Sequence, residues 1–320
     1  MNSPNRETPV LAVVVPCYNE EPVIEETARR LLEALAGLRA KSKIADGSFV
    51  YFVDDGSGDG TWGRVAALHA RHPEIRGLKL AGNVGHQNAL LSGILEVKDR
   101  ADCAVSIDAD LQDDVEAIER MVDGFAEGND VVYGVRRQRA TDTVWKRQSA
   151  QFFYRFIRLM GVDVVYNHSD FRLLSRRVMD SLAGFREVNL FLRGIVPSIG
   201  FQSTIVHYDR GRRFAGESKY PLRKMLSFAF DGITSFSVVP LRFVTAFGMA
   251  LFVLSILLSG WVVTSVIRGN VVPGWASTVL PVYILGGLQL VGIGLVGEYI
   301  GKIYKEVKAR PRFIKEEELF

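Results

Sequence analysis

The sequence FVYFVDDGSGDGT, residues 49–61, passes from a short apolar run into a turn rich in carboxylates and glycines. An apolar run of this length is typical of one buried β-strand, and an amphipathic stretch follows it from Thr61 to His69. The same succession recurs along the N-terminal part of the chain, with further apolar runs at 11–15, 75–80, 103–107 and 130–135. This alternation predicts an α/β domain whose mostly parallel sheet carries helices on both faces.

The polar residues that follow these runs are the candidates for chemistry, because ligands of such sheets bind beyond the carboxyl ends of the strands. The clusters are Pro16–Glu20 after the first run, Asp54–Thr61 after the second, Asp108–Gln112 after the fourth, and Arg136, Arg137 and Arg139 after the fifth. We therefore expect three acidic or polar clusters and one basic cluster to meet at one edge of the sheet.

The turn at residues 56–60 allows three interpretations. Its glycines resemble a dinucleotide-binding loop, but Thr61 stands where that loop has its third glycine, and the nearby carboxylates would repel a pyrophosphate. It could also be an ordinary strand–turn–helix junction that Asp59 caps. We favour a site for a base and a ribose, because Asp54 and Asp55 can accept hydrogen bonds from imide N–H and hydroxyl groups.

The motif Asp108-Ala109-Asp110 follows the apolar run CAVSI. Carboxylate oxygens are the ligands that Mg²⁺ or Mn²⁺ prefers, and substrate phosphates can complete the coordination. Two aspartates at this spacing also occur as helix caps. Their place at the end of a predicted strand favours a divalent metal site at Asp108 and Asp110.

Composition excludes several classes of protein. Of the 320 residues 48% are apolar, so the chain is not disordered, and its length fits about two structural units. The net charge of +3 is too small for the concentrated basic face of a nucleic-acid-binding protein. Cys17 and Cys103 lie far apart, which excludes a disulfide framework and a cysteine-based zinc site. Residues 1–9 are polar and no signal-like apolar core follows, so the N-terminal domain is expected to be cytoplasmic.

Two long uncharged runs, residues 243–267 and 269–297, predict transmembrane helices at 242–267 and 274–300. Basic residues are concentrated before the first run and after the second, while the loop between the helices carries Arg268. The positive-inside bias then places both ends of this multi-pass segment in the cytoplasm.

Taken together, the blocks V-x-P-x-Y-N-E at 14–20, V-D-D-G-S-x-D-G-T at 53–61 and D-A-D-L-Q at 108–112 resemble those of the family 2 glycosyltransferases of GT-A fold. Asn83-x-Gly85-His86-Gln87 fits a further block of that family. Within the family, the blocks at 169–176 and 213–220 resemble the polyisoprenyl-phosphate glycosyltransferases, the group of dolichol-phosphate mannose synthases and bactoprenol glucosyltransferases. The resemblance covers nearly the whole chain.

The resemblance implies a Rossmann-like GT-A domain over residues 1–220, followed by the two transmembrane helices. An apolar stripe next to the first of them predicts an interfacial amphipathic helix at 221–241. Residues 301–320 are expected to form a basic cytoplasmic tail. The location implied is the bacterial inner membrane, where the protein would serve the cell envelope; a homo-oligomer is left open.

The activity implied is transfer of a hexose from a nucleotide sugar, UDP-glucose, to a polyprenyl phosphate, with inversion at the anomeric carbon. The metal at Asp108 and Asp110 would bind the diphosphate. The residues implied in donor binding are Pro16, Tyr18, Glu20, Asp54, Asp55, Gln112 and Lys219. The residues implied in catalysis are Asp170, Arg136, Arg139 and Arg147.

The role of Asp170 stays open between a general base and an aligner of substrate hydroxyls. A lipid phosphate is largely a dianion at neutral pH and needs charge screening more than proton removal. Two other functions are considered. A processive polysaccharide synthase would carry a Q-x-x-R-W block, which the sequence lacks. A non-enzymatic membrane scaffold or transporter is a further alternative. Against it, the two uncharged runs contain no ionisable residue that would mark a pathway through the membrane.

Overall fold

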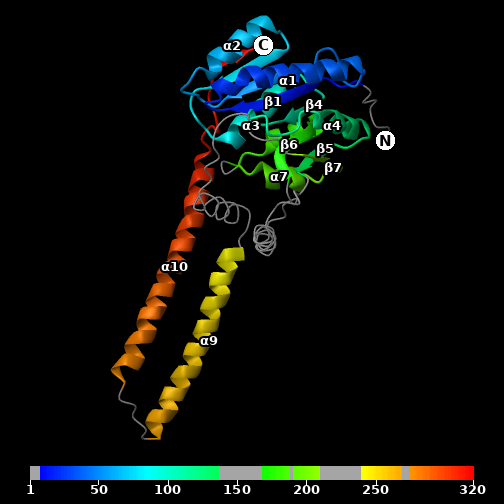
Figure 1. Ribbon diagram of the computed structural model, residues 1–320. Helices are drawn as coiled ribbons and strands as arrows, with labels where there is room; N and C mark the ends of the chain where they lie inside the picture. Colours follow the sequence, from blue (N-terminus) through cyan, green and yellow to red (C-terminus); the bar gives the residue numbers. More distant parts are fainter. Residues whose placement is uncertain (1–7, 137–167, 188–189, 210–238, 269–273) are drawn as a thin grey trace. The chain divides into compact units, whose positions relative to one another are not determined.

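The computed structural model describes residues 8–136, 168–187, 190–209, 239–268 and 274–320 (Figure 1). Among these residues, those before position 210 and those from Arg310 to Phe320 form one compact unit. The helices α9 (Val239–Ile267) and α10 (Trp275–Lys308) form a second unit.

The described part of the first unit is built on one eight-stranded sheet, in the order β7-β5-β6-β4-β1-β2-β3-β8. Its strands are β1 (Leu11–Cys17), β2 (Phe49–Asp54), β3 (Ile75–Leu80), β4 (Cys103–Ser106), β5 (Val131–Arg136), β6 (His168–Ser175), β7 (Ser203–Tyr208) and β8 (Lys315–Leu319). Strands β1 to β4 are parallel to one another, and β5 is parallel to β7. Strand β6 runs antiparallel to β4 and β5, and β8 runs antiparallel to β3. The prediction of an α/β fold with a mostly parallel sheet is confirmed.

Helices cover both faces of this sheet. They are α1 (Glu21–Ala40), α2 (Thr61–Arg71), α3 (His86–Val97), α4 (Ala117–Ala126), α6 (Arg176–Gly184) and α7 (Leu192–Ser198). Successive side chains of a strand point to opposite faces, and Val13 and Phe52 lie in the same core as Ile24 of α1. The opposite face meets α3, where a Cβ atom on Gly93 would lie 2.6 Å from the side chain of Val14. Gly93 therefore permits the close approach of α3 to the sheet.

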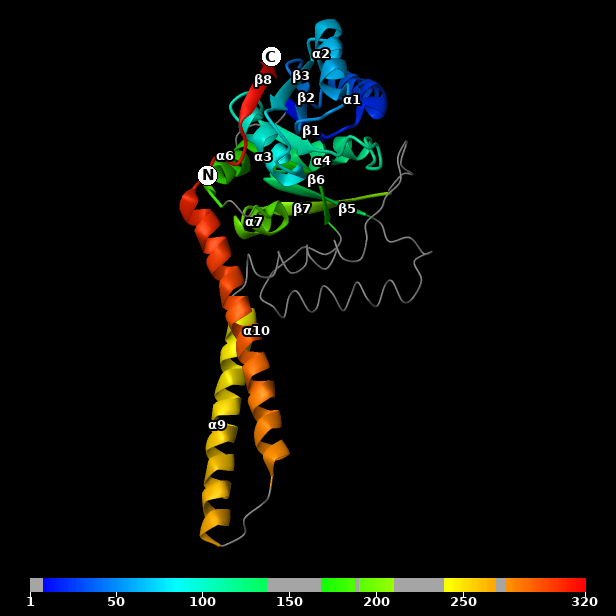
Figure 2. The same cartoon turned by 90° about the vertical axis from the view of Figure 1, so that its left-hand side faces the viewer.

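Residues 301–320, predicted as a basic tail, divide between a helix and a strand. Helix α10 continues to Lys308, and β8 then lies at the edge of the sheet beside β3 (Figure 2). The indole N–H of Trp62 donates to Glu317 Oε2 at 2.8 Å, although 255 positions separate the two residues. The ring of Phe320 lies 5.3 Å from that of Tyr51. Strand β8, at the C-terminus, is thus part of the first unit, whose strand ends carry the clusters of polar residues.

Helices α9 and α10 contain most of the two uncharged runs and lie side by side (Figures 1 and 2). Within the described residues, no helix has the combination of length and apolar character that crossing a membrane requires. The two transmembrane helices stay a prediction. The interfacial helix predicted at 221–241 lies outside the described residues, except for positions 239–241 at its end.

Candidate functional site

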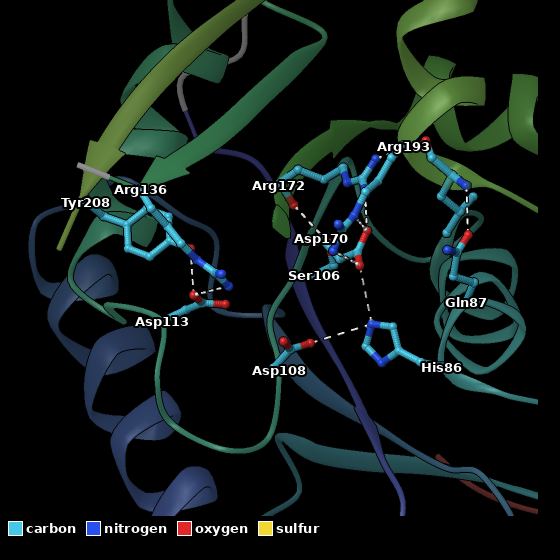
Figure 3. Close-up of polar contacts among 11 residues, drawn as sticks. His86, Gln87, Ser106, Asp108, Asp113, Arg136, Asp170, Arg172, Arg193 and Tyr208 are labelled. Carbon is cyan, nitrogen blue, oxygen red and sulfur yellow. Dashed lines mark hydrogen bonds and ion pairs between the residues drawn. The ribbon is translucent and has the colours of Figure 1, made fainter. Parts of the chain in front are cut away.

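The candidate site lies where β4 ends and β6 begins, shown in Figure 3. Because β6 is antiparallel to β4, with Arg172 opposite Ser106, the first residues of β6 lie beside the segment that follows β4. The Ser106 hydroxyl donates to the backbone carbonyl of Asp170 and fixes this junction. The sheet topology therefore brings Asp170 and Asp108 together, although 62 positions separate them in the sequence.

Asp108 and Asp110 stand at the strand end as the sequence predicts. The loop is tightly turned, because Leu111 has φ +56° and the N–H of Gln112 donates to Asp110 Oδ1 at 3.1 Å. Asp108 is partly buried, and 40% of its side chain is accessible. Loss of hydration, together with the carboxylates of Asp113 and Asp170, raises the pKa of Asp108 to about 6.

This donor set fits a divalent cation. Clustered carboxylates that raise one another's pKa are relieved when a cation binds among them. Mg²⁺ in particular is bound through one or two carboxylates and completed by substrate phosphates. In the described parts of the chain no group of three or more His, Cys, Asp or Glu side chains is arranged to hold a metal ion. If a cation binds here, the protein would supply Asp108 and Asp110, and substrate phosphates would supply the remaining ligands.

Asp170 is bound by two arginines. Arg172 Nη2 lies 2.5 Å from Asp170 Oδ1, and Arg193 donates from Nε to Oδ1 at 3.2 Å and from Nη2 to Oδ2 at 2.9 Å. Burial alone would raise the pKa of Asp170, but the two guanidinium charges outweigh it and hold the pKa well below its usual value. Asp170 is therefore ionised at neutral pH.

His86 lies between the two carboxylates. Its Nε2 is 3.6 Å from Asp108 Oδ1 and 3.7 Å from Asp170 Oδ2 (Figure 3). The ring is carried by the first residue of α3, after Gly85 with φ +86°. Gln87 accepts a hydrogen bond from the N–H of Leu192 at 2.9 Å, so α3 also holds the start of α7.

The predicted base and ribose residues lie at the ends of β1 and β2. Asp54 and Asp55 are buried, and their burial raises the pKa of both carboxyl groups. Asp54 accepts a hydrogen bond from the hydroxyl of Ser57. Asp55 accepts hydrogen bonds from the backbone N–H groups of Val84 at 2.7 Å and Gly85 at 3.0 Å. Both carboxylates thus hold the loops around them.

The β1–α1 turn is joined to the β2–α2 turn. The N–H of Glu20 donates to Thr61 Oγ1 at 3.0 Å, and Pro16 pairs with Val53 in the sheet. Tyr18, by contrast, is 49% exposed. Of the residues predicted to bind the donor, Tyr18 thus presents an open aromatic face beside this edge.

Arg136 at the end of β5 belongs to a separate cluster. Its Nε donates to the hydroxyl of Tyr208 at 3.0 Å, and that hydroxyl donates to Asp113 Oδ1 at 2.6 Å. Arg136 Nη2 also lies 3.4 Å from Asp113 Oδ1. In Figure 3 this cluster and the Asp170 cluster lie on opposite sides of Asp108. A groove of about 1070 Å³ opens beside Gln112 and Asp113, along α1.

The structure places Asp108 and Asp170 on either side of His86, with Asp110 in the loop after Asp108, and Arg136 is held by Tyr208 and Asp113. Arg139, Arg147 and Lys219 lie outside the described residues. Sequence reasoning gave no role to His86, Arg172 or Arg193. The first two lie in blocks that the sequence singles out, at 83–87 and 169–176, whereas no local pattern marks Arg193.

Comparison with known proteins places the chain in a family. Residues 12–183 match the model of the family described as glycosyl transferase family 2. The chain is 52% identical over 312 residues to the uncharacterized glycosyltransferase YkoT of Bacillus subtilis, covering 98% of this chain and 93% of that protein. It is 37% identical over 309 residues to the bactoprenol glucosyl transferase of Shigella phage SfX, covering 95% and 98%. A solved mannosyltransferase from Pyrobaculum calidifontis, in complex with GDP-Man and Mn²⁺, is 17% identical with a TM-score of 0.43, covering 93% and 89%.

Proposed function

The chain belongs to glycosyl transferase family 2 and is a glycosyltransferase, and from this premise we propose that it transfers a hexose from a nucleotide sugar to a polyprenyl phosphate. The donor we propose is UDP-glucose, and the transfer inverts the anomeric carbon. The relatives named bactoprenol glucosyl transferase support the lipid phosphate as acceptor. Family membership also sets aside the non-enzymatic scaffold.

One observation carries the proposal: His86 lies between Asp108, the first carboxylate of the Asp108–Asp110 pair, and Asp170, which is paired with two arginines. An acidic pair suits a metal bound to a leaving diphosphate, and an adjoining cationic group suits an anionic nucleophile. Transfer between two phosphate-bearing substrates needs both the metal-binding acidic pair and the cationic group.

In the proposed donor complex, Asp108 and Asp110 would hold Mg²⁺ or Mn²⁺, which would neutralise charge on the leaving nucleoside diphosphate. The base and ribose lie at the ends of β1 and β2, where Tyr18 offers its ring and the backbone of the Asp54–Asp55 turn is held firmly. The other residues proposed for donor binding are Pro16, Glu20, Gln112 and Lys219.

The lipid phosphate attacks the anomeric carbon without a general base, because it is largely a dianion at neutral pH. We propose that Asp170 is an ionised group that aligns the substrate and is not a general base. A carboxylate with a strongly lowered pKa is a poor proton acceptor near neutral pH. Arg136, and with it Arg139 and Arg147, would screen the repulsion between the two anionic substrates. Attack opposite the leaving group inverts an α-linked donor to a β-linked product.

We also propose that α9 and α10 anchor the enzyme in the cytoplasmic membrane. Large apolar side chains such as Leu257, Trp261 and Leu290 are exposed on these helices, which suits an apolar surrounding. A cysteine placed at position 270 should react with an impermeant thiol reagent added to intact cells. One placed at Asp46, in an exposed loop of the first unit, should react only after lysis. The opposite labelling pattern would refute this orientation.

The enzymatic proposal is tested with purified full-length protein in detergent, radiolabelled UDP-glucose and a polyprenyl phosphate. The expected product is lipid-soluble label whose formation needs Mg²⁺ or Mn²⁺ and stops in excess chelator. Asp110→Asn should abolish transfer, whereas Asp114→Asn, in the same segment but paired with Arg120 at 3.5 Å, should not. Full activity in chelator would refute the metal, and water-soluble polymer would indicate a processive synthase.

A further inference from the structure

We propose that Arg193, on α7, binds the phosphate group of the acceptor while Asp170 holds its guanidinium in place. The inference rests on the proposed function, in that the acceptor is a prenyl phosphate. It adds an acceptor-binding residue that lies in none of the sequence blocks, and it assigns Asp170 its alignment role through that residue.

The backbone that carries Arg193 is held from two directions. Gln87 of α3 accepts a hydrogen bond from the backbone N–H of Leu192 at 2.9 Å. Arg172 Nη1 of β6 donates a hydrogen bond to the backbone carbonyl of Leu192 at 3.1 Å. Both peptide groups that flank the start of α7 are therefore fixed by side chains of the site. A substrate-binding side chain needs such support, because its position must be set within a fraction of an ångström.

The two arginines on Asp170 differ in access. Arg172 is 1% exposed and makes its contacts within the protein, whereas the side chain of Arg193 is 34% exposed. Arg193 meets Asp170 through Nε and Nη2, so its planar fork is oriented by a two-point contact. A guanidinium has five N–H donors, and these two bonds use two of them, so a phosphate oxygen can accept a hydrogen bond from Arg193 while Asp170 still holds the group.

Arg193 also stands on the side of the site that the reaction requires. Asp108 is separated from it by His86 and Asp170, at contacts of 3.6 Å, 3.7 Å and 2.9 Å in turn. With the leaving diphosphate at Asp108, an in-line nucleophile must approach from the opposite side. Arg136, which is bonded to Tyr208 and Asp113, lies on the other side of Asp108 from Arg193 (Figure 3).

The test compares Arg193→Gln and Arg193→Lys with Arg176→Gln. Arg176 is a matched control, because it is a partly exposed arginine of the same unit that pairs with an aspartate, Asp102, at 3.3 Å outside the site. In transfer assays, Arg193→Gln should raise the KM for polyprenyl phosphate about ten- to a hundredfold, as expected for one lost bond between charged groups. The KM for UDP-glucose and the slow hydrolysis of UDP-glucose should not change. Arg193→Lys should recover part of the loss, and Arg176→Gln should behave as wild type.

Calorimetric titration with a short-chain prenyl phosphate, without donor, gives a readout independent of transfer. Wild type and Arg176→Gln should bind it, and Arg193→Gln should bind it at least about tenfold more weakly. Equal binding by all three proteins, or none by wild type, would overturn the assignment of Arg193. A rise in the KM for UDP-glucose would overturn it as well and place Arg193 on the donor. Wild type that binds the prenyl phosphate but transfers no sugar to it would refute the proposed function and leave this binding result to stand.

Discussion

Replacing Asp108 by asparagine should stabilise the metal-free protein at neutral pH while it abolishes sugar transfer. Loss of hydration and neighbouring carboxylates raise the pKa of Asp108 from 3.8 to about 6 in the folded state. Above pH 6 the ionised carboxylate therefore opposes folding, and an amide of the same shape removes that charge. A residue that destabilises the empty protein is expected where a cation is to be bound.

The size of the effect follows from the shift. A change of about two pKa units at 1.36 kcal/mol each sets an upper bound of about 3 kcal/mol. Since 40% of the side chain is accessible, solvent screening reduces this, and we expect about 1 kcal/mol. For a unit of this size that corresponds to a rise of about 2–4 °C in the midpoint of thermal unfolding. The sign depends on pH: the folded state binds the proton more tightly, so the penalty is complete above about pH 6 and disappears near pH 4.

The assay is thermal unfolding of the full-length protein in chelator, at about pH 7.5 and near pH 4. Asp108→Asn should unfold at a higher temperature than wild type at the first pH and at the same temperature at the second. Asp46→Asn, on an exposed loop, is the control and should match wild type at both. Adding Mg²⁺ or Mn²⁺ should raise the midpoint of wild type but not that of Asp108→Asn. A lower midpoint for Asp108→Asn at pH 7.5, or a difference that persists near pH 4, would refute the electrostatic argument.

Three further outcomes are expected. Gly56→Ala should lower the free energy of unfolding in denaturant titrations by at least about 1–3 kcal/mol, because φ is +66° and the new Cβ would lie 2.6 Å from the backbone of Gly82; Gly63→Ala, in open space on α2, should not destabilise. Asp170→Asn should lower transfer at every pH between about 5 and 8, because the paired arginines hold the pKa of Asp170 well below this range; an ascending limb in the wild-type pH–rate profile that this variant removes would make Asp170 a base. Phe320→Ala should lower the thermal midpoint through loss of about 1 kcal/mol of aromatic packing, and an unchanged midpoint would mean that β8 does not dock in solution.

The parallel core and its acidic edge could be predicted because local patterns determine them. Runs such as Leu11–Val15 and Cys103–Ile107 are too short for helices and too apolar for loops, so each predicts a buried strand. The carboxyl ends of parallel strands meet at one edge, which places Asp108 and Asp110 in the site before any coordinates are known.

The rest of the site depends on contacts between residues far apart in the sequence. Strand β8 has the sequence KEEEL, without the alternation that marks a half-buried strand, and it is held by partners such as Trp62. Arg193 lies in a seven-residue helix that contains Pro197 and has no clear periodicity. The role that we propose for it depends on its contact with Asp170, which lies on β6. Tyr208 is likewise recognisable as a partner of Arg136 only in the folded chain.

Asp108 and Asp170 lie on either side of one imidazole, yet their environments shift their pKa values in opposite directions. Carboxylates whose environments separate them in this way have different tasks. Burial and the neighbouring carboxylates raise the pKa of Asp108 more than His86 lowers it, so binding a cation there would lower the energy of the site. Asp170 already holds two guanidinium groups, so it gains little from a metal and cannot readily take a proton. The same electrostatics support our proposal that the leaving diphosphate lies on the Asp108 side and the anionic nucleophile on the Asp170 side, which would set the direction of the reaction across the site.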